Sequence, residues 1–386
     1  MSNEARFLLL MAGGTSDDEL RALADAGLDW QVLGILAERE HTFPVFWNRI
    51  ARVAKGQYPA ELGQQMSRRA MVAQFSLLNQ MRLLQTTLAA LNAAGIESIL
   101  LKGAGLAAGL YKSFVERPMG DVVLLVRPEA AVAARDVLLQ AGWMQHGMTE
   151  LSDFYAGHHH LEPFFDAKGS GASLELHTDI LALGHPFELS VDKWWERHQV
   201  VSVGPQPGWA PSPLHQLLHV CVHFAWSNGL GSSSWNAFRD AATLIREGRI
   251  DWDEFTKTAA EARAHTCAYW TLHLAKELAR VDVPGGVLER LHRPKAWARA
   301  LVVRDFSVGF SATGIACPST RLRRAIWEAA VQPEASGHGD IRPWVRDHLF
   351  TVRTPRADAP GGWRIAAWRK YLAAVLRGTP AARAVV

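Results

Sequence analysis

The stretch ILLKGAGLAAGLY, residues 99–111, decides the predicted fold. Its first residues complete a short, mostly apolar run that begins at Ile96 and ends before Gly103, which is typical of a buried β-strand. The small residues that follow favour a helix to about Tyr111. A strand that turns into a helix through glycine presents backbone N–H groups and the positive helix end to an anion. The stretch therefore predicts a phosphate-binding turn, to which Lys102 adds a positive charge.

Two further strands are predicted downstream. The run DVVLLV, residues 121–126, is apolar after its first residue and is expected to be buried. The run SLELH, residues 173–177, alternates with period two, which places Glu175 and His177 on one face. Asp121 and Glu175 provide carboxylates, which are ligands that Mg²⁺ prefers. A phosphate turn together with two carboxylates indicates metal-assisted nucleotidyl transfer.

Helices are predicted on both sides of this small core. After Pro59, apolar residues recur at helical spacing until Gly95, and four helical runs follow from Pro213 onward. The predicted class is α+β, a small mixed sheet flanked by N-terminal and C-terminal helical regions. The expected organisation is an N-terminal helical region (1–95), an α/β core (96–180), a helical domain (181–310) and an Arg- and Trp-rich, partly helical C-terminal region (311–386).

Composition narrows the class of protein. With 48% hydrophobic and 20% charged residues over 386 positions, the chain has ordinary globular values, which excludes a disordered or fibrous protein. A formal charge of only +3 lacks the basic excess of a nucleic-acid-binding protein, so nucleic acid is not an expected partner.

Targeting and cysteine patterns indicate a soluble protein. The three cysteines are far apart and lack a C-x-x-C spacing, so neither a disulfide framework nor a cysteine zinc site is predicted. A reducing compartment fits this pattern. The apolar run 7–12 is shorter than a signal-peptide core, and no stretch approaches the roughly 20 apolar residues of a membrane span. A cytoplasmic protein without membrane contact is expected.

Taken in order, several motifs resemble an uncharacterised bacterial nucleotidyltransferase family of the polymerase-β-like superfamily. The resemblance covers about residues 5–350 and implies a nucleotidyltransferase-like core. It rests on LLKGAGLAAGLY (100–111), RPMGDVVLLVRPE (117–129), HHHLEPF (158–164), LELH (174–177), LHVCVHFAW (218–226), FRDAATLI (238–245) and IDWDEF (250–255).

The resemblance implies that the chain binds a nucleoside triphosphate, expected to be ATP, with Mg²⁺ or Mn²⁺. In this family two carboxylates spaced i, i+2 on one strand, and a third on a neighbouring strand, hold the metal. These positions fall on Asp121, Val123 and Glu175, so the second carboxylate is replaced by an apolar side chain. Residues i and i+2 of a strand share a face, and Val123 binds no metal there. This departure puts the two-metal mechanism in doubt.

Two functions therefore stay open. The first is transfer of a nucleotidyl group to a hydroxyl of a small molecule, peptide or protein. The second is a catalytically degenerate protein that binds a nucleotide or a peptide without transfer. In both, Lys102 and Gly103 are expected at the triphosphate, with Arg117 near it and His160 in the nucleotide or acceptor pocket. In the first, Asp121, Glu175 and His177 are the predicted catalytic residues, His177 as the candidate acid or base.

Each of these residues also has an ordinary structural alternative. Asp121 is placed to cap a turn, and Glu175 to be a solvated residue on an edge strand. Gly103 serves a strand-to-helix turn through its backbone freedom. Arg117 suits a surface ion pair, and His177 a core histidine that bonds the backbone.

The 16 histidines raise the possibility of zinc. A strand through 158–160 would put two imidazole rings on one face and one on the other, and His215, His219 and His223 recur at i, i+4, i+8. Two imidazoles one turn apart bind zinc, but the H-E-x-x-H motif with its general-base glutamate is absent. Packing with local hydrogen bonds is the favoured interpretation.

Two other enzyme classes fit less well. Gly103, Gly105 and Gly109 follow a strand as G-x-G-x-x-x-G, which differs from the dinucleotide-binding fingerprint, and Asp121 begins a strand where that fingerprint places its acid at a strand end. A serine or cysteine hydrolase lacks both the G-x-S-x-G elbow and a recognisable cysteine motif.

Overall fold

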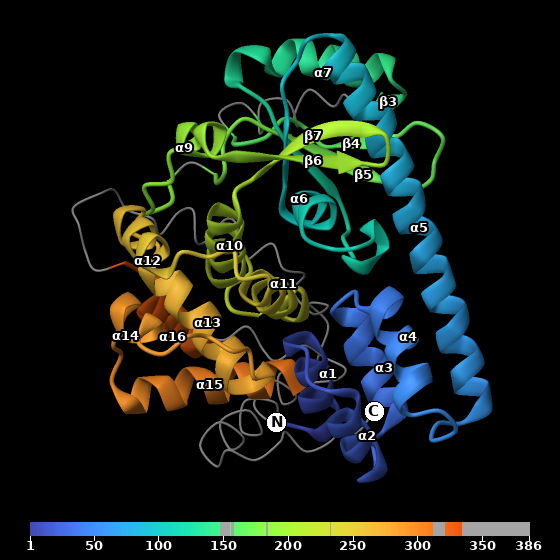
Figure 1. Cartoon of the computed structure of the whole chain (residues 1–386), viewed down its shortest axis with the longest axis vertical. Helices are drawn as coiled ribbons and strands as arrows, with labels where there is room; N and C mark the ends of the chain where they lie inside the picture. The colour runs from blue at the N-terminus through green and yellow to red at the C-terminus, as the bar shows by residue number, and fades with distance from the viewer. Residues whose placement is uncertain (147–154, 156–157, 183, 232, 312–320, 334–386) are drawn as a thin grey trace.

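The computed structural model describes residues 1–146, 155, 158–182, 184–231, 233–311 and 321–333 (Figure 1). It is a mixed α/β protein in which helices flank a single sheet, which confirms the predicted α+β class with a nucleotidyltransferase-like core. Of the predicted C-terminal region 311–386, only Ser311 and 321–333 fall within the described residues.

The sheet has seven strands in the order β3-β4-β5-β2-β1-β7-β6. Strand β1 runs antiparallel to β2 and parallel to β7, while β2 runs parallel to β5. An antiparallel β1–β2 pair excludes the parallel mononucleotide-binding unit of a dinucleotide-binding fold. The strands are β1 (Ile99–Leu101), β2 (Val122–Leu125), β3 (Trp143–Met144), β4 (Phe164–Asp166), β5 (Ser173–His177), β6 (His198–Val203) and β7 (Gln206–Pro211).

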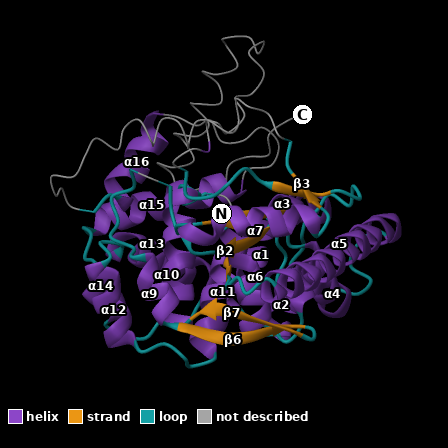
Figure 2. Cartoon of the chain, turned by 90° about the horizontal axis from the view of Figure 1, so that it is seen from above, coloured by secondary structure: helices purple, strands orange, loops and turns teal. Residues whose placement is uncertain are grey.

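The β6–β7 hairpin is a difference from the sequence-based prediction, because it lies inside the range 181–310 that was expected to be helical. Figure 2 shows both strands along one edge of the molecule. Strand β7 contains Pro207, Gly208 and Pro211, which interrupt the alternation by which strands are recognised. Its pairing through Trp209 with Ile99 nevertheless makes it a neighbour of β1.

The two faces of the sheet pack into different cores. On one face, apolar residues such as Leu100 and Leu124 meet Leu84 of α5, together with α7. On the other face, Leu101 and Val123 join a larger cluster that includes α1, α10, α11 and α13. Because side chains alternate along a strand, the residues of β5 that share the face of Val123 are the polar ones. The helices next to these strands are α6 (Lys102–Gly109), η1 (Phe114–Glu116), η2 (Pro128–Ala130) and α7 (Ala131–Gln140).

The predicted long N-terminal helix is confirmed as α5, which runs along one side of the molecule (Figure 1). Its apolar stripe is only partly buried. Met66 reaches Gly34 and Leu84 packs on the sheet, but Met71 and Phe75, which lie between these contacts, are 66% and 74% exposed. The N-terminal helices are α1 (Asn3–Gly13), α2 (Asp17–Asp25), α3 (Trp30–Arg39), α4 (Phe43–Val53) and α5 (Ala60–Ala93).

The remaining helices pack beside the second face of the sheet. Helix α1 contacts α11 and α13, so the N-terminal helices and the later helices share one core. No helix among the described residues is long and apolar enough to cross a membrane. The later helices are α9 (Val191–Glu196), α10 (Pro213–Val222), η3 (His223–Ser227), α11 (Ser234–Arg246), α12 (Trp252–Glu261), α13 (His265–Ala279), α14 (Val287–Leu291), α15 (Ala296–Ser311) and α16 (Arg321–Val331).

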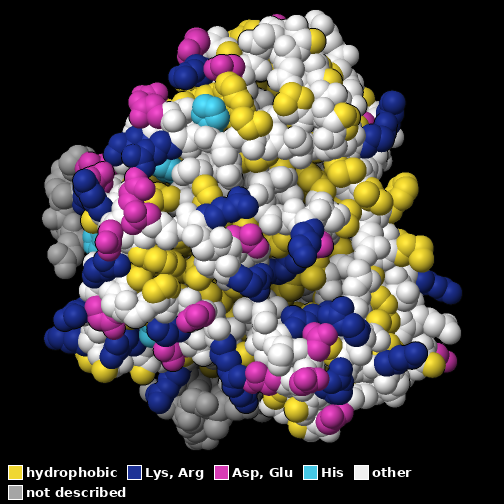
Figure 3. Space-filling model, in the orientation of Figure 1, with side chains coloured by type: hydrophobic (Ala, Val, Ile, Leu, Met, Phe, Trp, Pro, Cys, Tyr) yellow, Lys and Arg dark blue, Asp and Glu magenta, His cyan; other side chains and the backbone are white. Residues whose placement is uncertain are grey.

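The surface carries both signs of charge. On the face shown in Figure 3, Lys and Arg side chains are interspersed with Asp and Glu side chains around apolar hollows. The ion pairs on the exposed helices, such as Arg69–Glu38 and Lys193–Glu261, mix the signs in the same way. This distribution agrees with the formal charge of +3.

Candidate functional site

Three charged side chains come together where β1, β2 and β5 lie side by side. The register pairs Leu101 with Val123, and Val123 with Glu175. Lys102 follows β1 directly, and its Nζ lies 3.5 Å from Oε2 of Glu175. Asp121 precedes β2 and interacts electrostatically with both Lys102 and Glu175. The structure therefore brings together the predicted phosphate lysine and the two predicted carboxylates.

The two carboxyls differ in how easily they ionise. Burial, reinforced by the charge of Glu175, raises the pKa of Asp121, and the charge of Lys102 offsets this only in part. Burial also opposes ionisation of Glu175, but the hydrogen bond to His177 and the charge of Lys102 outweigh it and hold the pKa of that carboxyl below its usual range. A bound cation would therefore change the ionisation of Asp121 more than that of Glu175, because Glu175 is already held in its ionised form.

His177 holds Glu175 in place. Its ring is fully buried, and Nε2 lies 3.0 Å from Oε2 of Glu175. Burial lowers the pKa of His177 to about 4, although the hydrogen bond to Glu175 acts in the opposite direction. The ring is therefore neutral at neutral pH. Its Nδ1 lies 3.2 Å from the carbonyl oxygen of Asp179, so both ring nitrogens face oxygens and the single N–H is donated to one of them. Glu175 is half-buried on a central strand, which rules out a solvated residue on an edge strand.

In the turn after β1, the start of α6 lies very close to Leu100 of the strand and to Met119 of the connection before β2. Lys102, rather than Gly103, has the left-handed conformation, with φ of 47°. A Cβ on Gly103 would lie 2.9 Å from Cβ of Met119, and a Cβ on Gly105 would lie 2.3 Å from the carbonyl oxygen of Leu100. Glycine at these positions lets α6 begin directly against the sheet, with its first backbone N–H groups beside Lys102.

Arg117 forms a buried ion pair. Its Nε lies 2.9 Å from both carboxylate oxygens of Asp240 on α11, and Nη2 lies 2.8 Å from Oδ2. The Tyr111 hydroxyl donates to Oδ1 of Asp240 at 2.7 Å. The side chains of Arg117 and Asp240 are only 12% and 1% exposed, so the alternative of a surface ion pair is wrong. The pair ties the connection before β2 to the later helices.

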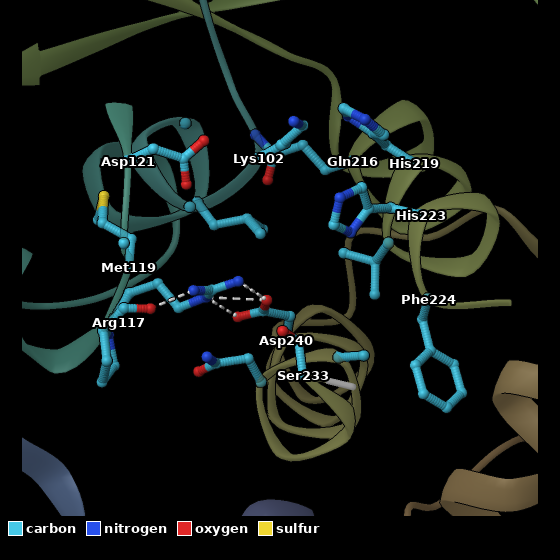
Figure 4. A pocket seen from close by; sticks show the side chains of 18 of the residues that line it. Lys102, Arg117, Met119, Asp121, Gln216, His219, His223, Phe224, Ser233 and Asp240 are labelled. Atoms are coloured by element: carbon cyan, nitrogen blue, oxygen red, sulfur yellow. Dashed lines mark hydrogen bonds and ion pairs between the residues drawn. The ribbon is translucent and has the colours of Figure 1, made fainter. Parts of the chain in front are cut away.

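A cavity of about 140 Å³ separates the sheet from α10 and α11. Lys102 and Asp121 line it on the sheet side, while His219 and His223 line it on the helical side (Figure 4). Asn236 of α11 belongs to the same lining. Nε2 of His219 and Oδ1 of Asn236 are buried without a hydrogen-bond partner among the described residues. Such groups are costly to bury unless a ligand or water satisfies them. The cavity is therefore suited to a polar ligand.

The histidines of the predicted site take different places. His160 does not line this cavity; it stacks on His177, with ring centroids 5.1 Å apart. On α10, His215 bonds Oγ of Ser212 at 2.8 Å, which agrees with the expected local bonding. Burial lowers the pKa of His223 to about 3, so its ring reaches the cavity in the neutral form.

Sequence reasoning missed the helical side of the cavity. These residues lie in motifs that carried the resemblance. Asp240, in FRDAATLI, received no role, and His219 and His223, in LHVCVHFAW, were considered only as zinc ligands, with packing as the favoured interpretation. The sequence did contain a signal for these residues, because they are polar and lie inside otherwise apolar helical runs. Polar side chains are buried in such helices only where they have bonding partners or belong to a functional site.

The residues present fit one divalent cation rather than two. Asp121 and Glu175 offer carboxylate oxygens, and Mg²⁺ commonly uses one or two protein carboxylates and fills its remaining positions with water and phosphate. Val123 is 1% exposed and lies in register between Leu101 and Glu175, so this position of β2 offers no metal ligand. When bound, Mg²⁺ would neutralise phosphate charge beside these two carboxylates.

A mixed sheet that carries this basic and acidic set on one face, next to a cavity with polar side chains in its lining, defines the class as nucleotidyltransferase-like. The family model described as "Uncharacterised nucleotidyltransferase" matches residues 26–280, and the chain belongs to this family. Membership supports a general role in nucleotidyl transfer and implies a nucleoside triphosphate substrate. Comparison with curated proteins finds no match, and comparison with solved structures finds none either.

Proposed function

We propose that the chain binds ATP with one Mg²⁺ or Mn²⁺ and transfers a nucleotidyl group to a hydroxyl of a small molecule, peptide or protein. The observation that carries this proposal is the convergence of Lys102, Asp121 and Glu175 on one face of the sheet, where Lys102 and Asp121 also line the cavity. Lys102 and the first N–H groups of α6 bind the triphosphate. Asp121 and Glu175 hold the cation against it.

The chemistry is a displacement at the α-phosphorus. The acceptor oxygen forms a bond to this phosphorus, the bond from the phosphorus to the bridging oxygen breaks, and pyrophosphate leaves. The hydroxyl proton passes to water. His177, the predicted acid or base, is fully buried with both ring nitrogens against oxygens, so it positions the carboxylate of Glu175 instead of accepting this proton. Lys102 and the helix end stabilise the charge that develops on the phosphate oxygens.

The cavity is the proposed room for the acceptor. Arg117 lines the cavity and is held there by Asp240, which supports the proposal that its guanidinium faces the phosphates from a fixed position. Two cavity atoms have no hydrogen-bond partner among the described residues. Oδ1 of Asn236 can accept a hydrogen bond from the molecule that receives the nucleotidyl group, and Nε2 of His219 can donate or accept one according to its tautomer. A near-neutral surface and a small cavity favour a small or extended acceptor over a nucleic-acid duplex.

A second candidate is a catalytically degenerate protein that binds a nucleotide or peptide without transfer. The observation that favours it is Val123, because this buried apolar side chain leaves the site without a second carboxylate on β2. A single cation can bind the triphosphate without supplying the symmetric clamp of a two-metal site.

The proposal predicts a cation-dependent activity that needs Asp121. The purified full chain, given each radiolabelled nucleoside triphosphate with Mg²⁺ or Mn²⁺ and candidate acceptors, is expected to release pyrophosphate or form a labelled product. Asp121→Ala is expected to lower this rate by about 100-fold or more, since it removes a ligand of the single proposed cation. Asp136→Ala, an exposed aspartate on α7, is the control and should keep the rate.

The outcomes separate the candidates. A rate that is the same in Asp121→Ala as in the wild type rejects the metal assignment. Cation-dependent nucleotide binding without any transfer, in the wild type and with every acceptor, favours the degenerate protein.

A further inference from the structure

Three imidazole rings form a cluster behind the candidate site. His158, His159 and His160 each bring one ligand nitrogen within 4.8 Å of the others. Their ring centroids are 4.4 to 4.7 Å apart. The sequence-based expectation of two rings on one face and one on the other is therefore wrong, because only His160 forms a β-bridge and the two residues before it lie in a bend.

The backbone that carries the cluster is fixed to the end of β5. The carbonyl of His159 accepts hydrogen bonds from the N–H groups of Thr178 and Asp179, at 2.8 and 3.2 Å. His160 pairs with His177, and the N–H of Leu161 donates to Leu176 at 2.9 Å. The histidines are therefore positioned by the sheet before any ligand binds, which lowers the ordering cost of a site.

One ring nitrogen each of His159 and His160 is in a form that can bind a metal. Nδ1 of His160 donates to the carbonyl of Leu161 at 2.7 Å, which leaves the lone pair on Nε2 unprotonated. A ligating histidine typically makes this kind of outer hydrogen bond. Nδ1 of His159 is buried without a hydrogen-bond partner among the described residues.

We propose that His158, His159 and His160 form a binding site for a divalent transition metal, of which zinc is the expected occupant. Imidazole nitrogens suit zinc, whereas Mg²⁺ prefers oxygen ligands, so this site is chemically distinct from the carboxylates of Asp121 and Glu175. The inference does not depend on nucleotidyl transfer. Three protein ligands leave a fourth position for water, as in catalytic zinc sites.

The geometry requires a small contraction of the cluster. Zinc binds imidazole nitrogens at about 2.0–2.1 Å, which brings ligand nitrogens of a tetrahedral site to about 3.4 Å from one another. The ligand nitrogens now lie up to 4.8 Å apart. Because hydrogen bonds hold the backbone at His159, the side-chain rings rotate toward one another to shorten these distances. His177, stacked on His160, lies next to the cluster and bonds Glu175, so the two sites adjoin.

The test is zinc binding by the full chain without a histidine tag, after treatment with a chelator and in the absence of nucleotide. Zn²⁺ is titrated in competition with a chromophoric chelator, and Co²⁺ replaces it for absorption spectroscopy. We expect one equivalent of Zn²⁺ per chain and the absorption of a low-coordinate Co²⁺ site. His158→Gln and His160→Gln are each expected to weaken binding by at least about 100-fold, more than the loss of an outer partner costs. His146→Gln, an exposed histidine outside the cluster, should have no effect.

Circular dichroism distinguishes loss of ligation from loss of fold. If the buried His160→Gln variant does not fold, the half-buried His158→Gln variant carries the test. The proposal is overturned if a folded His158→Gln variant binds Zn²⁺ as tightly as the wild type does. It is also overturned if the wild type shows no saturable Zn²⁺ site in the competition titration. Because nucleotide is absent from these titrations, failure here is distinguishable from failure of the proposed nucleotidyl transfer.

Discussion

Replacement of Val123 by aspartate is expected to raise the rate of nucleotidyl transfer by about 100-fold or more over the wild type. The new carboxylate would share its face with Asp121 and lie in register with Glu175. Carboxylates at i and i+2 bridge two metal ions, and a second ion stabilises both the attacking and the leaving oxygen. A 100-fold gain corresponds to about 2.7 kcal/mol of additional transition-state stabilisation, at about 1.4 kcal/mol for each tenfold in rate.

The same substitution should cost stability when no cation is present. Val123 is 1% exposed and packs with Leu101, so a carboxylate at this position would place a further negative charge beside Glu175. We expect the melting temperature to fall relative to the wild type, and Mg²⁺ to raise it more in Val123→Asp than in the wild type.

Val123→Asn is the matched control, because asparagine has nearly the shape of aspartate without its charge. Pyrophosphate release, measured in parallel for the three proteins, checks the prediction. A folded Val123→Asp protein that binds Mg·ATP yet is no faster than Val123→Asn would show that a carboxylate at this position does not increase the rate of transfer.

The second large effect concerns stability. Asp240→Ala is expected to lower the free energy of unfolding by about 3–5 kcal/mol, the usual cost of removing one partner from a buried ion pair. The substitution leaves the guanidinium of Arg117, 12% exposed, without its anion, and leaves the Tyr111 hydroxyl without its acceptor. Urea denaturation followed by circular dichroism measures the change.

Two further variants test the cause of this effect. Asp136→Ala breaks the exposed Arg135–Asp136 pair, whose side chains are 42% and 52% exposed, and should leave stability nearly unchanged. The double variant Arg117→Met, Asp240→Leu removes both charges and should recover part of the loss. A loss in Asp240→Ala no larger than in Asp136→Ala would mean that this pair does not hold the connection to α11.

The sheet that carries the site was predictable only where the sequence pattern is local. Strands β1 and β2 are apolar runs near glycines, and β5 alternates, so each was found within a few residues of its bounds. The β6–β7 hairpin was missed because prolines and a glycine interrupt β7. The exposed part of α5 was also missed, since helical periodicity does not reveal which segment of a long helix has a neighbour.

The site was predictable on its sheet side and not on its helical side. Lys102, Asp121 and Glu175 each occupy a strand end or a known strand face, so their convergence follows from pairing of neighbouring strands. Asp240 lies 123 residues from Arg117, and only tertiary packing brings the two together. The three adjacent histidines were assigned to opposite faces because a strand was assumed where the chain bends.

Calorimetric titration of Mg·ATP into the purified full chain tests most directly whether Lys102, Asp121 and Glu175 form a nucleotide site. We expect one nucleotide per chain, binding that disappears when EDTA removes the cation, and an affinity at least about 10-fold lower in Lys102→Ala, which loses a charged contact of about 1.5–3 kcal/mol. Lys193→Ala, an exposed lysine on α9, should bind as the wild type does. Absence of binding in the wild type and in Val123→Asp alike would contradict the nucleotide site.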